Sequence, residues 1–118
     1  MADLRNNETL VQIAALATSV QRFHERFDQG SPASHDEMLD RIPIQDEEVR
    51  ELEQALRGEG PERTASEAVD VLFVAIGTIL RLDPELASAA IDEVIVKNDA
   101  KTRDTHHINA AGKVVRKP

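Results

Sequence analysis

The segment VDVLFVAIGTIL, residues 69–80, most restricts what this chain can fold into. As a helix it is apolar on almost every side, and such a helix is buried at the centre of its assembly. It is too short to cross a bilayer, which takes about 20 apolar residues. Asp70 interrupts the pattern, and a buried carboxylate without a partner is unfavourable or becomes protonated. The sequence therefore predicts a central helix whose carboxylate meets a partner.

Length and composition favour one all-α domain. A chain of 118 residues is of single-domain size. Apolar residues make up 41% of it but aromatic residues only 3%, so small aliphatic side chains must fill the core, as in a helical bundle. Cysteine is absent, which excludes disulfides and thiolate metal sites. We expect an all-α, four- to five-helix bundle-type subunit that is completed by oligomerisation, because small domains often depend on a partner chain.

Turn and capping signals divide the chain into helices. Ser34 and Glu37 have the spacing of a capping box, and Thr64 and Glu67 repeat it. Pro43 is expected to end one helix and to begin the next in its first turn. Residues 58–63, GEGPER, read as a linker. Helices are expected over residues 7–28, 34–41, 43–57, 66–81 and 84–101, followed by a tail or a short strand.

The charge is unevenly distributed. The net charge of −8 argues against duplex nucleic acid as a partner. Residues 97–118 nevertheless carry a net charge of +4, which leaves −12 for the rest. Such a chain either holds cations on one side and phosphate on the other, or has a solvated acidic face and a disordered basic C-terminal tail, residues 105–118. No secretory signal and no membrane span are evident, so we expect a cytoplasmic protein without a membrane partner.

Two groups of carboxylates lie on either side of the linker. The first is EEVRE, residues 47–51, and the second is EAVD, residues 67–70. Residues three or four apart share a helix face, where like charges repel. Helices joined by a short linker usually pack antiparallel, which turns the two groups toward each other. Only cations make that arrangement favourable, and all-oxygen ligands suit Mg²⁺, or alternatively Mn²⁺. Taken alone, EEVRE is typical of an ordinary charged helix face, and the metal interpretation depends on its combination with EAVD.

Three histidines have two interpretations each. His24, beside Phe23 and Phe27, is either a wall of a base pocket or a packing residue of the first helix. His106 and His107 are either ligands and phosphate donors or surface residues, and their spacing is not that of a metal site.

The carboxylate pattern resembles a known signature. EEVRE, then fifteen residues, then EAVD is similar to the EExxE…ExxD signature of the MazG-like, all-α nucleoside triphosphate pyrophosphohydrolases. VQRFHERF and VLFVAIGTIL resemble two helices of the branch related to phosphoribosyl-ATP pyrophosphatase, and VIVKNDAK with GKVVRKP resembles its ending. The resemblance spans residues 20–118. The chain departs from the family pattern at Pro43, at Phe73 and in its short linker.

The resemblance implies a helical homodimer or homotetramer that cleaves (d)NTP to (d)NMP and pyrophosphate, as in housecleaning of the nucleotide pool. It implies that Mg²⁺ is held by Glu48, Glu51, Glu67 and Asp70. It makes Glu47 and Glu48 the catalytic residues, with Glu47 either a further ligand through water or the group that orients or deprotonates the attacking water. Asn98, Lys101 and Lys113 would contact phosphates, and His24 would line the base pocket.

Two other functions remain open from the sequence. One is hydrolysis of phosphoribosyl-ATP, although the first-helix pattern and the GKVVRKP ending resemble the MazG-like side more. The other is a non-catalytic helical oligomer in which metal only ties the bundle together and the basic tail is a docking segment.

Overall fold

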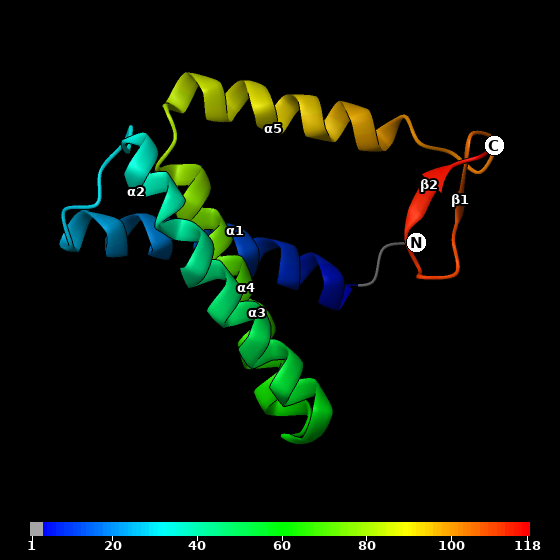
Figure 1. The fold of residues 1–118 in the computed structure, drawn as a ribbon, viewed down its shortest axis with the longest axis horizontal. Coiled ribbons are helices and arrows are strands. Elements are labelled where there is room, and N and C mark those ends of the chain that lie inside the picture. The colour runs from blue at the N-terminus through cyan, green and yellow to red at the C-terminus, as the bar shows by residue number, and fades with distance from the viewer. Residues whose placement is uncertain (1–3) are drawn as a thin grey trace. The chain divides into compact units, whose positions relative to one another are not determined.

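The computed structural model describes residues 4–118, which are mostly helical (Figure 1). The helices and strands of this part of the chain are α1 (Leu4–Arg26), α2 (His35–Leu39), α3 (Arg41–Gly58), α4 (Pro61–Leu80), α5 (Pro84–Asp99), β1 (His106–Ile108) and β2 (Val114–Arg116). The expected all-helical character is confirmed, apart from the two short strands. No helix in the described residues is long and apolar enough to cross a membrane.

The helix boundaries follow the local signals with one exception. Ser34 caps α2 in a reciprocal capping box with Glu37, as expected. Pro43 lies in the first turn of α3, where its missing amide proton costs nothing. The second expected capping box is wrong: α4 already begins at Pro61, and the Thr64 hydroxyl donates 2.9 Å to the Gly60 carbonyl inside the first turn. Proline at a first helical position is pre-organised for helix, so it extends α4 backwards by one turn.

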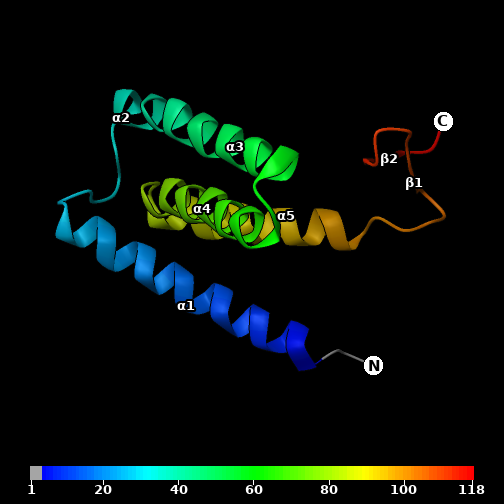
Figure 2. The same cartoon turned by 90° about the horizontal axis from the view of Figure 1, so that it is seen from below.

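The chain divides into two compact units, and the first extends to Pro84. Within it, α4 lies between α1 and α3, as Figure 2 shows. The rings of Phe73 on α4 and Phe23 on α1 pack nearly perpendicular to each other, with 5.4 Å between ring centroids. Helices α3 and α4 are antiparallel neighbours joined by a two-residue connection. The apolar helix predicted from VDVLFVAIGTIL is thus the middle helix of this unit.

Arg81, at the end of α4, holds the connection between α1 and α2. Its Nε donates a 3.0 Å hydrogen bond to the Gly30 carbonyl, and its Nη2 forms a 2.6 Å ion pair with Glu37. The Arg81 carbonyl accepts a 2.8 Å bond from the Ala33 amide. The side chain is buried, so this network fixes the end of α4 against the loop and α2.

The apolar core within one chain is small. Its buried apolar members among the described side chains are Val20, Ala55 and Val74, one from each of the three long helices of the first unit. Many large apolar side chains remain exposed, including Leu10 and Phe27 of α1 and Val49 and Leu56 of α3. Apolar surface of this extent is typical of a face that another chain covers.

The second unit begins at Glu85 and contains α5 and a β-hairpin. Strands β1 and β2 are antiparallel, with His107 opposite Val115. Asn109 and Gly112 form the turn: the Asn109 Oδ1 accepts from the Ala111 and Lys113 amides, and Gly112 has a φ of +82°, which suits glycine. The segment expected as a tail or a short strand therefore forms a defined hairpin.

Candidate functional site

A ladder of polar side chains joins α3 to α4. Arg41 Nη2 donates 2.9 Å to the Val74 carbonyl, and one turn later Gln45 Nε2 donates 3.1 Å to the Val71 carbonyl. Residues spaced by three and four positions lie on one helix face, so the next residue of this ladder is Glu48. Because the helices are antiparallel, Glu48 lies beside the turn of α4 that precedes Val71. This turn contains Glu67 and Asp70. The ladder therefore brings the carboxylates of the two sequence motifs together.

These carboxylates form a tight acidic cluster. Glu48, Glu67 and Asp70 each contribute one carboxylate oxygen to this cluster, and these three oxygens lie within 4.8 Å of one another. Glu51, one turn after Glu48, is half-buried, and its charge contributes to raising the pKa of both Glu48 and Glu67. Four of the five acidic residues of the two motifs thus converge, as the sequence predicts.

Burial and mutual repulsion make the cluster costly when all its members are charged. The pKa of Glu48 is raised, first by desolvation and then by the charges of Glu51 and Asp70. The pKa of Glu67 is also raised, mainly by desolvation; Arg63 opposes this shift, and Glu51 and Asp70 add to it. The cluster therefore binds protons more readily than isolated carboxylates do, unless another cation is present.

Arg63 is the basic side chain that contacts the cluster among the described residues. Its Nη2 lies 2.6 Å from Glu67 Oε1. The second oxygen of Glu67 is buried and has no hydrogen-bond partner in the described chain, and the same holds for Oε2 of Glu48. Buried charged oxygens without partners are strongly unfavourable. All the metal-ligand atoms that the acidic cluster offers are carboxylate oxygens, so the cluster fits a hard cation such as Mg²⁺.

Two expectations about individual carboxylates need qualification. The apolar neighbours of Asp70 predict that it is the buried carboxylate, but it is exposed within the chain. The buried carboxylate is Glu67, which is only 1% exposed, because this position of α4 turns toward α3. Glu47 is exposed and is not one of the three clustered residues, so its assignment to the attacking water stays a prediction.

His24 lies in the interior of the first unit, beside Gly77 of α4 and Arg41 of α3. It is 5% exposed, and its Nδ1 has no hydrogen-bond partner in the described residues. Desolvation, followed by the nearby Arg41 charge, lowers the pKa of His24. This burial matches the interpretation of His24 as a packing residue; its role in a base pocket stays a prediction.

The other expected substrate residues belong to the second unit. Asn98 Oδ1 accepts a 3.0 Å hydrogen bond from Lys101 Nζ, which orients the ammonium group of Lys101. Lys113 follows the hairpin turn. Sequence reasoning missed the ladder residues Arg41 and Gln45, whose spacing to Glu48 was the available signal.

The comparisons with known proteins add no relative. No family model matches the chain, and the searches of curated proteins and of solved structures found no similar protein.

Proposed function

We propose that this protein is a Mg²⁺-dependent nucleoside triphosphate pyrophosphohydrolase that cleaves (d)NTP to (d)NMP and pyrophosphate. The observation that supports the proposal is a pair of buried carboxylate oxygens, on Glu48 and Glu67, that find no hydrogen-bond partner among residues 4–118 and belong to a cluster of like charges. A protein gains nothing structurally from such a group unless a cation joins it. EEVRE and EAVD resemble the pyrophosphohydrolase signature, which suggests that the cation serves in the hydrolysis of a nucleoside triphosphate.

Glu48, Glu51, Glu67 and Asp70 are the residues that would hold the metal. When bound, Mg²⁺ supplies neutralisation of the phosphate charge and activation of water for attack on phosphorus. Asp70 and Glu51 give the cluster an accessible side, which a triphosphate needs in order to approach. Glu47, exposed beside the cluster in sequence, is the candidate for orienting or deprotonating the water.

The proposal includes association of the chain into a homodimer or a homotetramer. Exposed apolar residues on α1 and α5 support it, because water-exposed apolar area of this kind is usually buried between chains. Helix α5 has no buried residue within its own chain, although it carries Leu86, Ile91, Val94 and Ile95.

Product analysis tests the reaction. The protein is incubated with NTPs, dNTPs and phosphoribosyl-ATP, with and without Mg²⁺, and the released phosphate species are identified. We expect pyrophosphate and a nucleoside monophosphate, and only with metal. Release of single phosphate would contradict the cleavage position. Turnover of phosphoribosyl-ATP alone would favour the phosphoribosyl-ATP alternative, and no turnover of any substrate would favour a non-catalytic oligomer.

Variants of the cluster sharpen this test. Glu51→Gln and Asp70→Asn keep the shape of the side chain and remove one charge, so we expect folded proteins without turnover. Glu53→Gln, on the same helix as Glu51, is the matched control and should keep its activity, because Glu53 forms an exposed ion pair with Arg57 and is not part of the acidic cluster. Near-normal Mg²⁺-dependent activity in either cluster variant would show that the assigned ligands are wrong.

A further inference from the structure

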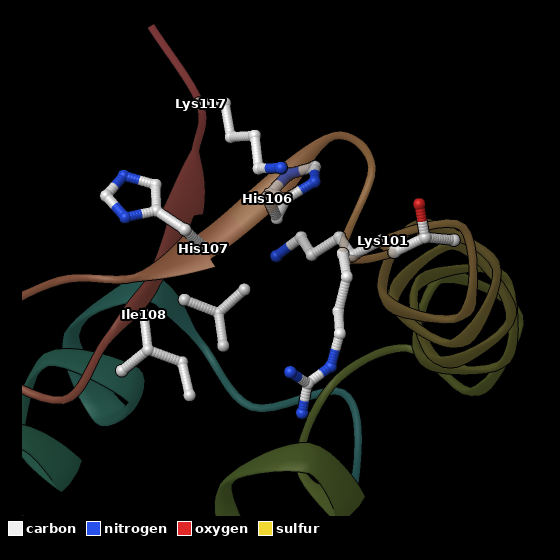
Figure 3. Close-up of a pocket in the computed structure, with 8 residues that line it drawn as sticks. Lys101, His106, His107, Ile108 and Lys117 are labelled. Atoms are coloured by element: carbon white, nitrogen blue, oxygen red, sulfur yellow. The ribbon is translucent and has the colours of Figure 1, made fainter.

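The second unit contains a basic pocket, and Lys101 is the one of its lining residues that the proposed hydrolysis uses. It has a volume of about 700 Å³ and lies between the end of α5 and the hairpin. Its walls include Lys101, Arg103, His106, Ile108, Val114 and Lys117, and Figure 3 shows side chains of this hairpin pocket around its opening. Pockets of this size bind small molecules of nucleotide dimensions. No carboxylate is among the described residues that line it.

The positive charges of the hairpin pocket are not compensated. In the part of the chain that the structure describes, Arg103 and Lys117 form no ion pair. Lys101 donates to the neutral amide oxygen of Asn98, which orients its ammonium group without neutralising it. Three cations therefore surround one cavity in a protein whose net charge is −8. Such a concentration of one sign of charge attracts anions into the cleft.

Hydrogen bonds hold the walls of the pocket in place. The Lys117 amide donates 2.9 Å to the Thr105 carbonyl, and the His106 amide donates 2.8 Å to the Thr102 carbonyl. These bonds connect the end of β2 to the turn before β1, so Lys117 and His106 are both held in the wall of the pocket. A site whose backbone is already ordered loses less entropy when a ligand binds.

His106 gives the pocket a group that responds to an anion. Its Nδ1 lies 2.7 Å from the Thr105 hydroxyl, which fixes the ring. Desolvation, then the charges of Lys101 and Arg116, lowers the pKa of His106. An anion in the pocket offsets those positive charges, so binding is expected to raise the pKa of this imidazole.

We propose that the hairpin pocket binds the phosphate chain of a phosphoanhydride directly, without a bridging metal. Arg103 and Lys117 contact phosphate oxygens through charge-assisted hydrogen bonds. Ile108 and Val114 add apolar wall, which suits a ligand with a non-phosphate part such as a nucleotide. The inference shares only Lys101 with the proposed hydrolysis and does not depend on the acidic cluster.

Calorimetric titration in EDTA tests the proposal, with pyrophosphate, tripolyphosphate and ATP as the probes. We expect saturable binding without metal, weakened about tenfold or more by Arg103→Gln and by Lys117→Gln, since each removes a charged hydrogen-bond donor. Lys97→Gln is the matched control, because it removes the same charge from α5 outside the pocket. ATP binding more tightly than tripolyphosphate assigns the pocket to nucleotides; equal affinities assign it to the phosphate chain alone.

Two further measurements separate this site from the acidic cluster. Glu48→Gln should bind pyrophosphate in EDTA as the natural chain does, even where it has lost turnover. The NMR titration of the His106 ring should shift to higher pH when pyrophosphate is present. The proposal is overturned by absence of binding in EDTA, by variants at Arg103 and Lys117 that bind normally, or by an equal loss in Lys97→Gln.

Discussion

Arg41 reaches from the start of α3 to the backbone of α4, where its Nη2 donates a 2.9 Å hydrogen bond to the carbonyl oxygen of Val74. Its Nε donates 3.2 Å to the hydroxyl of Thr78. The guanidinium is thus buried against two neutral acceptors, and desolvation lowers its pKa. It lies directly over Gly77, together with His24. The packing of α1, α3 and α4 therefore depends on a residue without a side chain.

Gly77→Ala should destabilise the protein. A Cβ at this position would lie 2.6 Å from both Arg41 Nη2 and His24 Nε2, closer than real Cβ contacts. Both side chains must move, and overpacking of this kind costs about 1–3 kcal/mol of unfolding free energy. Denaturant unfolding measures the loss. Gly58→Ala is the control, because a Cβ added there would meet nothing within 4 Å and alanine favours helix. Equal stability of the two variants would contradict this account of Gly77.

Gln45→Leu should weaken Mg²⁺ binding while the helices stay intact. Gln45 holds α3 to the Val71 carbonyl one turn before Glu48, so its loss relaxes the distance between Glu48 and the carboxylates of α4. Supporting residues of this kind typically change metal affinity by roughly tenfold or more. Gln54→Leu is the matched control, because Gln54 is exposed on the same helix. Titration with Mg²⁺ measures the metal affinity of the two variants, and circular dichroism measures their helix content. Identical affinities would show that Gln45 does not position the cluster.

The sequence predicted the positions of the helices better than it predicted which face of each helix is buried. Helix-stop and capping signals are local, so Ser34, Pro43 and the GEGPER linker located the boundaries to within about a turn. The apolar residues of α3 do not mark its packing face, because Val49 and Leu56 are exposed while Ala55 and Arg41 are buried. Which face packs depends on the neighbouring helix, and here the neighbour offers backbone carbonyls that polar side chains can reach.

The convergence of the acidic cluster was predictable, but the burial of its members was not. Spacing on two antiparallel helices brings Glu48, Glu67 and Asp70 together whatever surrounds them. Burial instead follows from how α4 rotates against α3, which the apolar neighbours in the sequence do not reveal. The hairpin pocket was missed for a similar reason, since its charges come from separate turns and only the folded hairpin joins them.

Glu48→Gln should raise the melting temperature in EDTA at neutral pH. The pKa of Glu48 in the folded chain lies above its usual 4.5, so the folded state binds the proton more tightly than the unfolded state. Stability is therefore lost as pH rises from about 4.5 through the folded pKa, and glutamine removes that loss.

The gain of this variant over the natural chain should shrink as pH falls toward 4.5. His24 changes stability in the opposite sense, because its lowered pKa costs stability as pH falls below 6.5, but it is common to both proteins and cancels in the comparison. Melting curves at a series of pH values in EDTA measure the difference. A gain in melting temperature that is independent of pH would show that folding does not raise the pKa of Glu48.

Ile95→Glu should prevent the proposed association of the chain. Ile95 is 52% exposed on α5, a helix without buried residues of its own, so a second chain is expected to cover it. A carboxylate there would be buried without a partner in the interface. Ile95→Leu keeps the apolar volume and is the control, which should associate normally. Sedimentation measures the masses, and a natural chain that is monomeric at micromolar concentration would refute the proposed association.

Mg²⁺ should stabilise the folded chain through Glu67, with Arg63 as its competitor. A ligand that binds only the folded state adds about 2.7 kcal/mol at a hundred times its dissociation constant, so the melting temperature should rise with Mg²⁺. Glu67→Gln removes the buried charge and should abolish this rise. Arg63→Gln leaves Glu67 without its 2.6 Å partner, so it should melt lower in EDTA but gain more from Mg²⁺ than the natural chain does. Thermal shifts across a Mg²⁺ series decide this, and the same rise in all three proteins would mean that the ion binds elsewhere.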